Sequence, residues 1–430
     1  MAQLRYQLYN MKFNSLRILI GLAFLVCALS IHAQKRSEYE YLHEMPVYVD
    51  SIQANLTYPL AWRNCQQSMS FKEWKVQARQ KVFDLMGPQP PKADDYAMKV
   101  VAEEQRDGYK AQRIEFNLSR WYRVSAYLLI PDGKGKHPTV NLLHDHGAHL
   151  YIGKEKMIKP FATDTAVVND ADRWVDNLYE GQYMGDYLAK NGYVVFSMDA
   201  PLWGDRGRKE GVDRNRYDII AGNMMMLGRD LCAFMHYDDV ESTRFLTTLP
   251  CVDKRRIGCA GCSMGAYRAW MLSALSDDIS VGCAICWMIT TSDQLTMKHG
   301  RKENGGFANC IPMLRNWLDY PDIASLACPK PMLFISGTKD KLFPVPGVEK
   351  AFDVMHQVWD SQKKGSHLET YLVDQPHECN LANQKAALDF FNKYLKCYRN
   401  IRFAYCPFRQ RLHNRLSSIW LVKKDLMLVP

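Results

Sequence analysis

The feature that most constrains the fold of this 430-residue chain is an alternation of short apolar segments with helical segments between residues 140 and 396. The segment 193–198 is too continuously apolar for a strand with one wet face, so it is typical of a strand buried on both sides. Strands that alternate with helices need crossover connections, which build a parallel sheet. The sequence therefore predicts an α/β fold, with a mainly parallel central sheet flanked by helices. The expected strands are 140–143, 193–198, 257–262, 281–288, 332–335 and 368–373.

The chain has a different pattern before this region. Residues 109–116 and 121–130 are rich in strand-forming residues and are followed by Pro-Asp-Gly, which is turn chemistry and favours antiparallel pairing. Further upstream, residues 71–86 have a helical pattern that ends at a Gly-Pro pair. The expected divisions are an N-terminal helical extension over 34–95 and the main α/β domain over 96–396.

The first 33 residues have the composition of a signal peptide. Three basic residues and no acid accompany an apolar run of 14 residues, 18–31. This run is shorter than the roughly 18–20 residues that a membrane span requires. We expect cleavage after Ala33 and an exported protein, periplasmic or extracellular, with no stable membrane span after signal removal. An uncleaved anchor is the alternative.

The net charge of +9 is concentrated at the two ends of the chain. Residues 397–430 carry seven Arg or Lys against Asp425 alone, and residues 34–396 are formally neutral. Nucleic-acid-binding domains use basic surfaces to attract phosphates, so we expect no nucleic-acid partner. We interpret 397–430 as a basic, poorly packed C-terminal tail, with a contact to a polyanion or a membrane as the alternative.

One motif lies directly after an expected strand. Residues 261–265 are Gly-Cys-Ser-Met-Gly, a G-x-S-x-G sequence between the strand 257–262 and an apolar helix over 266–275. In this context a sharp turn projects the serine hydroxyl above the sheet, and side chains at the glycine positions would collide with their surroundings. The helix N-terminus behind the serine favours negative charge. We predict that Ser263 is a nucleophile; the alternative is a tight-turn serine without chemistry.

A serine nucleophile needs a base that a carboxylate orients. Asp340 and His377 each follow an expected strand, and the order serine, acid, histidine is the one this fold type uses. The carboxyl ends of parallel strands meet at one edge of a sheet, so these side chains can gather there. We predict Asp340 as the acid and His377 as the base, with Asp293 as the rival acid. The alternatives are a helix-capping aspartate and a surface histidine.

Two backbone amides are expected to complete the site. Acyl transfer places negative charge on the former carbonyl oxygen, and hydrogen-bond donors must already point at it. The amide of Met264, next to the predicted nucleophile, supplies one donor. The second should come from the turn after the first parallel strand, which contains His146 and Gly147. We favour the amide of His146, with that of Gly147 as the alternative.

The same turn contains three histidines with the spacing of a metallo-hydrolase cluster, His144, His146 and His149. Ala148 stands where an acidic residue is expected just before the last histidine. Zinc hydrolysis normally needs further protein ligands, and the sequence does not identify them. We therefore favour a site without a metal.

Thirteen cysteines include Cys27 in the expected signal peptide. Two C-x-x-C pairs, Cys259 with Cys262 and Cys283 with Cys286, have a zinc-like spacing. Both pairs lie in expected strands, where residues i and i+3 point to opposite faces, so one ion cannot easily bind both members. We interpret them as buried structural cysteines, and we expect neither a metal nor a cofactor.

The segments that follow the strands resemble those of the α/β-hydrolases. Within that group, the chain is similar to the exported bacterial esterases described as acetylxylan-esterase-like or dienelactone-hydrolase-like. The resemblance spans 97–396, includes the helical extension before it, and implies an α/β-hydrolase fold. It also implies Ser263 as nucleophile, Asp340 as acid and His377 as base. The matching segments are 143–147, 199–201, 204–207, 261–265, 337–340 and 376–378.

Two departures from these families bear on the substrate. Dienelactone hydrolases use a cysteine nucleophile, whereas here Cys262 precedes Ser263. Glucuronoyl esterases resemble the Gly-Cys-Ser sequence but follow it with arginine, whereas this chain has Met264. These departures disfavour dienelactones and glucuronoyl esters, so an acetyl ester is favoured as the substrate by elimination.

Sequence and resemblance together predict an exported serine carboxylesterase that hydrolyses acyl esters of a carbohydrate, of the acetylxylan type. The substrate would be a small-molecule or polysaccharide ester, and no cofactor is needed. The segment 150–180 with Trp174 and the loop around Trp203 are expected to shape the pocket, although tryptophans also pack in cores. The alternatives are a serine peptidase of the same fold and a non-catalytic glycan-binding relative.

Overall fold

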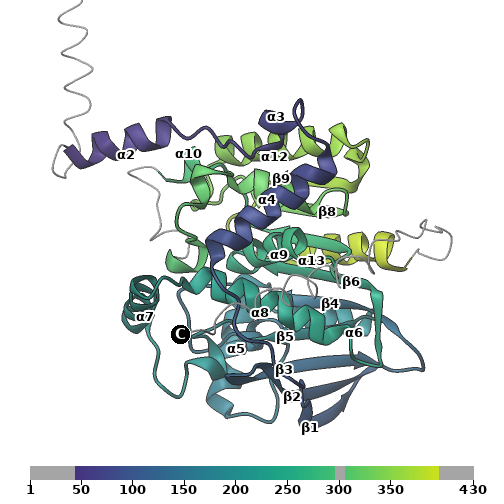
Figure 1. Cartoon of the computed structure of the whole chain (residues 1–430). Helices are drawn as coiled ribbons and strands as arrows, with labels where there is room; N and C mark the ends of the chain where they lie inside the picture. The colour runs from purple at the N-terminus through teal and green to yellow at the C-terminus, as the bar shows by residue number, and fades with distance from the viewer. Residues whose placement is uncertain (1–43, 296–305, 397–430) are drawn as a thin grey trace, which may run out of the picture.

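The computed structural model describes residues 44–295 and 306–396. The expected signal peptide (1–33) and basic tail (397–430) lie outside the described residues. The strands are β1 (Lys99–Arg106), β2 (Tyr109–Ser119), β3 (Tyr122–Pro131), β4 (His137–Leu143), β5 (Val194–Met198), β6 (Val252–Cys262), β7 (Val281–Ile285), β8 (Met332–Gly337) and β9 (Leu368–Val373). They form one nine-stranded sheet in the order β1-β2-β3-β5-β4-β6-β7-β8-β9 (Figure 1).

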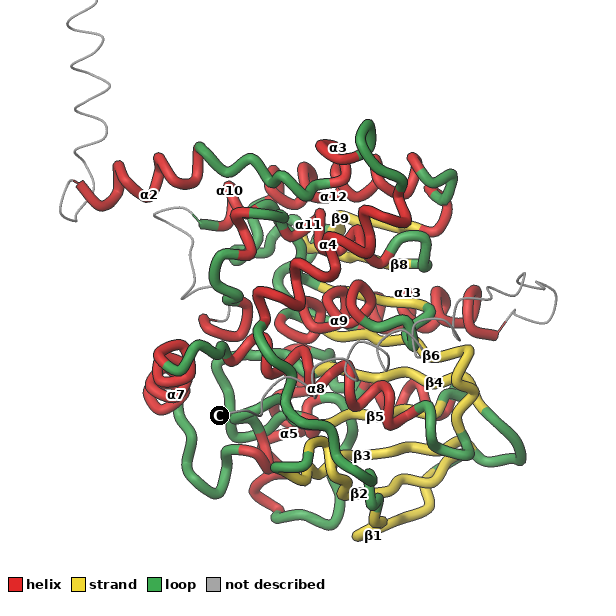
Figure 2. The backbone as a smooth tube through the Cα atoms, in the orientation of Figure 1, coloured by secondary structure: helices red, strands yellow, loops and turns green. Residues whose placement is uncertain are grey.

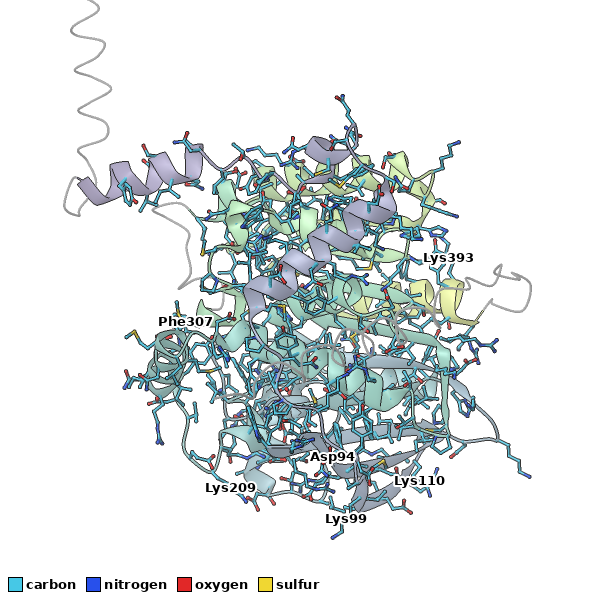
Figure 3. All side chains as sticks on the ribbon, in the orientation of Figure 1. Asp94, Lys99, Lys110, Lys209, Phe307 and Lys393 are labelled. Atoms are coloured by element: carbon cyan, nitrogen blue, oxygen red, sulfur yellow. The ribbon has the colours of Figure 1, made fainter. Side chains whose placement is uncertain are left out.

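Most of the sheet is parallel. Strands β5, β4, β6, β7, β8 and β9 pair in parallel, and β1, β2, β3 and β5 pair antiparallel in succession. The predicted fold class is confirmed, and the predicted hairpin is β2–β3. The sequence did not reveal β1, because its residues are mostly exposed and carry no apolar pattern. Lys99 and Lys110 lie at this outer edge of the molecule (Figure 3).

Helices cover both faces of the sheet (Figure 2). One face packs against α4 (Phe71–Met86), α8 (Leu231–Leu246), α9 (Met264–Leu275) and α12 (Val345–Ser361). The other packs against α5 (Thr165–Leu178), α6 (Met184–Lys190) and α13 (Leu381–Phe391). Val195 and Phe196, neighbours in β5, belong to opposite cores. Both faces of a strand are thus dry, which explains the unbroken apolar runs.

Three helices precede the sheet: α2 (Glu44–Ala54), α3 (Trp62–Cys65) and α4. Helix α4 begins at the predicted residue because Ser70 and Glu73 form a reciprocal capping box. It crosses the body of the protein, whereas α2 extends away from it (Figure 1). The described part of the expected helical extension contains these three helices and the segments that join them, and its boundary at residue 95 stays a prediction. No helix within 44–295 or 306–396 has the length and apolarity needed to cross a membrane.

Most of the remaining elements lie in the connections between strands. The strand predicted over 281–288 ends at Ile285, because Cys286 takes a left-handed φ of 60° and breaks the extended chain. The other helices are α7 (Arg214–Met226), α10 (Thr291–Gln294) and α11 (Tyr320–Ala324). The short turns are η1 (Lys154–Lys156), η2 (Gly204–Arg206), η3 (Gly306–Asn309), η4 (Leu314–Asn316), η5 (Ser325–Ala327), η6 (Gly365–His367) and the π-helical η7 (Asn392–Lys396).

A buried ion pair joins the two helices that pack behind the predicted nucleophile. Arg268 of α9 donates through Nε and Nη2 to the two carboxylate oxygens of Asp239 in α8, at 2.9 and 2.6 Å. Both side chains are fully buried. Burial raises the pKa of Asp239, and the charge of Arg268 opposes that rise. Neither charge is solvated by water, so each depends on the other.

The variant Asp239→Asn should lower the free energy of unfolding by about 3–5 kcal/mol, because the guanidinium of Arg268 would stay buried without its carboxylate. Urea unfolding followed by circular dichroism measures this loss. The double variant Arg268→Met/Asp239→Leu removes both charges and should recover most of it. A single variant as stable as the parent chain would contradict the role given to this pair.

Candidate active site

The turn between β6 and α9 holds Ser263 in a strained backbone conformation. Its φ is 55° and its ψ is −124°, a left-handed φ that residues with a side chain rarely adopt. The amide of Ser263 donates to the carbonyl of Ile285 in β7 at 2.9 Å, which anchors the turn to the sheet. The predicted strand–turn–helix context is therefore present, and the serine stands at the N-terminus of α9.

Two glycines make this turn possible. A Cβ on Gly265 would lie 1.9 Å from the carbonyl oxygen of Leu143, and a Cβ on Gly261 would lie 2.4 Å from the same oxygen. Real Cβ atoms essentially never approach a neighbour within 3.0 Å. The predicted need for glycine at both positions is confirmed, and it arises because α9 begins directly against the end of β4.

Asp340 and His377 are in contact beyond the ends of β8 and β9. Nδ1 of His377 donates to Oδ2 of Asp340 at 2.6 Å, and the amide of Leu342 donates to Oδ1 at 2.8 Å. The side chain of Asp340 is 1% exposed and that of His377 is 20% exposed. Burial disfavours the charged imidazole, but the hydrogen bond and charge of Asp340 outweigh it and raise the pKa of His377 above its ordinary value.

The rival acid, Asp293, has other partners. Its carboxylate accepts from Nζ of Lys350 at 3.0 Å and from the hydroxyl of Thr290 at 2.5 Å. These bonds tie α10 to α12 and to the preceding turn. Of the two candidate acids, Asp340 is the one that bonds to His377.

The sheet brings the predicted nucleophile and base to the same edge. Ile285 accepts from the Ser263 amide, and the next residue, Cys286, has its sulfur within 4.8 Å of one ligand-type atom each of Asp340 and His377. Within the described part of the chain, the hydroxyl of Ser263 forms no hydrogen bond. Since Asp340 occupies Nδ1 of His377, Nε2 is the nitrogen available to the serine.

The backbone amides of Met264, His146 and Gly147, near the predicted nucleophile, donate to no acceptor in the described residues. Met264 is the first residue of α9, where helix geometry leaves the N–H unpaired. His146 and Gly147 lie in the loop after β4. The ring of His146 packs on Trp203 and Tyr217, and Met264 belongs to the same apolar cluster. The loop and the helix start therefore meet.

Family and structural comparisons cover most of the described chain. A model described as the abhydrolase family matches residues 26–385. The chain belongs to the abhydrolase family. A relative, YtaP of Bacillus subtilis (strain 168), is 26% identical over 289 residues, which cover 67% of this chain and 89% of YtaP.

Solved structures share the fold of this abhydrolase. One is a Bacteroides fragilis NCTC 9343 protein assigned as an acetyl xylan esterase, with a TM-score of 0.60 and 19% identity over 76% of this chain and 81% of that one. Another is a promiscuous CE15 esterase from a marine bacterial metagenome, with a TM-score of 0.57 and 13% identity over 76% of this chain and 93% of that one. The resemblance to α/β-hydrolases is confirmed at the level of family and fold.

In this abhydrolase each of the three histidines after β4 has its own hydrogen-bond partners and a structural role. His144 bonds through both ring nitrogens to backbone groups, at 2.8 and 2.9 Å. Nδ1 of His146 accepts from the amide of Ala148 at 2.9 Å, and Nε2 of His149 bonds to the carboxylate of Asp170. Burial, helped by nearby cations, lowers the pKa of His146 to about 3 and that of His144 well below its ordinary value. Both imidazoles are therefore neutral near pH 7.

The sheet splits the first C-x-x-C pair. Cys259 packs in the core on one face and Cys262 in the core on the other, as strand geometry requires. Burial raises the pKa of Cys259 to about 12, and burial also raises the pKa of Cys283. The cysteines within the described ranges are free thiols. Cys283 and Cys286, by contrast, both pack in the core that also holds Cys262, because Cys286 lies beyond the end of β7. The expected separation of this second pair is therefore wrong, although both thiols are buried as predicted.

An acidic group lies behind the site, beside the end of β5. Carboxylate oxygens of Glu155, Asp199 and Asp205 come within 4.8 Å of one another. Nζ of Lys154 bonds to all three, at 3.0, 2.8 and 2.8 Å, so an ammonium already occupies the centre of this group. Burial raises the pKa of Asp199 to about 6, and the charge of Lys154 opposes the rise. This group gives the matching segments 199–201 and 204–207 a structural role.

With His377 as the predicted base of an ester hydrolase, hydrolysis should decline on the acid side with a midpoint above pH 6.5, the ordinary pKa of histidine. His377 must be neutral to accept a proton, and its raised pKa means that falling pH protonates it early. The variant Asp340→Asn should move the midpoint to lower pH and reduce kcat by roughly 10⁴-fold, as the same change does in serine proteases.

The measurement is the pH dependence of kcat/KM with p-nitrophenyl acetate. Asp293→Asn is the matched control, because it removes the charge of the other candidate acid and should leave both the midpoint and kcat unchanged. If the midpoint moved with Asp293→Asn and stayed fixed with Asp340→Asn, the assignment of the acid would be wrong.

Proposed function

We propose that this abhydrolase is a serine esterase in which Ser263 attacks the carbonyl carbon of an ester. His377 accepts the serine proton through Nε2 and gives it to the leaving alcohol, while Asp340 holds the imidazole through Nδ1. Water then repeats the attack on the acyl-serine and releases the acid. The observation that carries the proposal is the bonded pair of Asp340 and His377, at 2.6 Å, at the sheet edge that bears the strained turn of Ser263.

The backbone amides would stabilise the oxyanion. The amide of Met264 comes from the helix start, and that of His146, or of Gly147, comes from the loop after β4. All three donate to no acceptor in the described ranges, which suits donors that wait for a developing charge. None of these steps needs a cofactor.

For the substrate we infer an acyl ester of a carbohydrate, of the acetylxylan type. The structural likeness to a protein assigned as an acetyl xylan esterase supports this class. Met264 stands where glucuronoyl esterases have arginine, which disfavours a glucuronoyl ester. Trp203 is fully buried against His146, so it supports the loop from behind and cannot face a sugar. The expected signal peptide supports export to the periplasm or beyond, where polysaccharides are met.

The variant Ser263→Ala should reduce hydrolysis of p-nitrophenyl acetate by about 10³-fold or more, with a residue of activity from binding and the oxyanion donors. A fluorophosphonate should label the parent chain at Ser263, as peptide mass spectrometry would show. Ser366→Ala, at an exposed serine of η6, is the matched control and should change neither result. Full activity in Ser263→Ala would refute the proposal.

The two alternative functions give different outcomes on a small substrate panel. A serine peptidase would cleave aminoacyl anilides faster than p-nitrophenyl acetate. A glycan-binding relative would bind polysaccharide, turn over no ester and resist the fluorophosphonate. Acetate release from a series of acetylated polysaccharides would then identify the sugar that the esterase prefers.

A further inference from the structure

The loop after β4 has a backbone conformation that needs external support. Gly147 has a φ of 56° and Ala148 a φ of 52°, so two consecutive residues are in the left-handed region. A residue with a side chain there costs about 1–3 kcal/mol and persists only where its surroundings over-determine it. The amides of His146 and Gly147 belong to this loop. The groups that hold the loop therefore also aim these amides.

The buried ammonium of Lys156 forms hydrogen bonds to this loop. Nζ of Lys156, in η1, donates to the carbonyl oxygens of Asp145 and His146, each at 3.2 Å. It also donates to Oδ1 of Asp145 at 3.2 Å. The side chain of Lys156 is 0% exposed, and the ring of Trp174 lies 4.5 Å from Nζ. Within the described residues, this fully buried ammonium directs its hydrogen bonds to one loop.

The direction of these bonds fixes the direction of the amides. In a planar trans peptide the C=O and the N–H point to opposite sides. Lys156 holds the C=O of Asp145, so the N–H of His146 points away from Lys156. It also holds the C=O of His146, so the N–H of Gly147 points away as well. Neither of these two amides donates to an acceptor within the described residues.

The carboxylate of Asp145 completes the support. Its Oδ2 accepts from the hydroxyl of Tyr179 at 2.8 Å and from Nε1 of Trp174 at 3.2 Å. The ring of Trp174 also covers Gly147 so closely that a Cβ there would lie 2.2 Å from it. We call Lys156, Asp145, Trp174 and Tyr179 the loop clamp. The contacts of these four side chains hold the loop in the conformation described here.

The turn that carries Lys156 is itself fixed to the sheet. Lys154 donates from its amide to Oδ1 of Asp199 at 2.7 Å and from Nζ to Oδ2 at 2.8 Å. Asp199 follows β5, the neighbour of β4. The ammonium of Lys154 donates to three carboxylates, whereas that of Lys156 donates to one carboxylate and two main-chain carbonyls. The two buried lysines of η1 thus have different tasks: Lys154 anchors the turn, and Lys156 holds the loop.

We propose that Lys156 is a positioning residue of the oxyanion hole, which turns the amides of His146 and Gly147 toward the carbonyl oxygen of the bound ester. This inference rests on the proposed esterase function and adds a residue to it. The amides act on charge that develops only in the transition state. Loss of Lys156 should therefore lower kcat and leave KM nearly unchanged.

The test is Lys156→Met, which keeps most of the side-chain volume and removes the ammonium. With p-nitrophenyl acetate, kcat should fall by about 10²-fold or more, the loss typical of an oxyanion donor, and KM should change by less than about threefold. The affinity for a phenylboronic acid, which mimics the tetrahedral intermediate, should fall with kcat.

Lys330→Met is the matched control. Nζ of Lys330 also donates to two backbone carbonyls, those of Ser273 and Ser276 at 2.8 and 2.6 Å, at the far end of α9. Its removal should lower stability to urea and leave kcat unchanged. Tyr179→Phe is the milder second variant, since it nearly conserves shape and removes only the hydroxyl, which bonds to Asp145 and to the sulfur of Met157. It should lower kcat in the same direction by a smaller factor, and it keeps the test decisive if Lys156→Met does not fold.

A folded Lys156→Met with parental kcat and boronate affinity, or one that changes KM alone, would overturn the inference while Ser263→Ala still supports the esterase. If Lys156→Met does not fold, a Tyr179→Phe variant with parental kcat has the same meaning. A parent chain that hydrolyses no ester and resists the fluorophosphonate would refute the proposed function, and the role of Lys156 with it.

Discussion

The contact on which the candidate site depends is the approach of the first residues of α9 to the last carbonyl of β4. With a Cβ on Gly265 only 1.9 Å from the oxygen of Leu143, there is no room for any other residue. This contact fixes the amide of Met264 relative to the loop that carries His146 and Gly147. A side chain at Gly265 would push the helix from the strand by an ångström or more, and displacements of that size cost roughly a hundredfold in rate. The glycine is therefore a distance constraint between two halves of one site.

The parallel sheet supplies the second constraint. Ser263, Asp340 and His377 are far apart in the chain, but each follows a strand of the same parallel run, so strand pairing brings their loops to one edge. The strands are rigid because helices bury them on both faces. Side chains placed just beyond such strands keep their geometry without large loops of their own. The clamp residues lie at the same edge, next to β4 and β5. The predicted triad and the loop clamp are therefore both positioned by one sheet.

The alternation of strands and helices and the G-x-S-x-G motif predicted the fold and the turn at Ser263, because both signals are local in the sequence. The choice between Asp340 and Asp293 needed the structure, since both follow strands and only side-chain bonding separates them. Lys156 gave no signal at all. Its run, Lys-Glu-Lys, is typical of a solvated surface, and the partners that bury these charges lie 11 and 45 residues away. Strand β1 was missed for the opposite reason, because an exposed edge strand needs no apolar pattern.

The buried charges around the loop after β4 have a physical rationale that packing alone would not provide. Replacing a buried ion pair by apolar residues of similar volume is often neutral or stabilising, so Lys156 and Asp145 are weak as a source of stability. Apolar packing, however, has no direction, whereas an ammonium between two carbonyls sets the orientation of both peptides. In the proposed esterase the loop needs orientation more than it needs burial, because its amides would have to point at a place where negative charge appears only briefly. A buried, hydrogen-bonded clamp would hold them there before the substrate arrives, which is the condition under which such donors stabilise a transition state most.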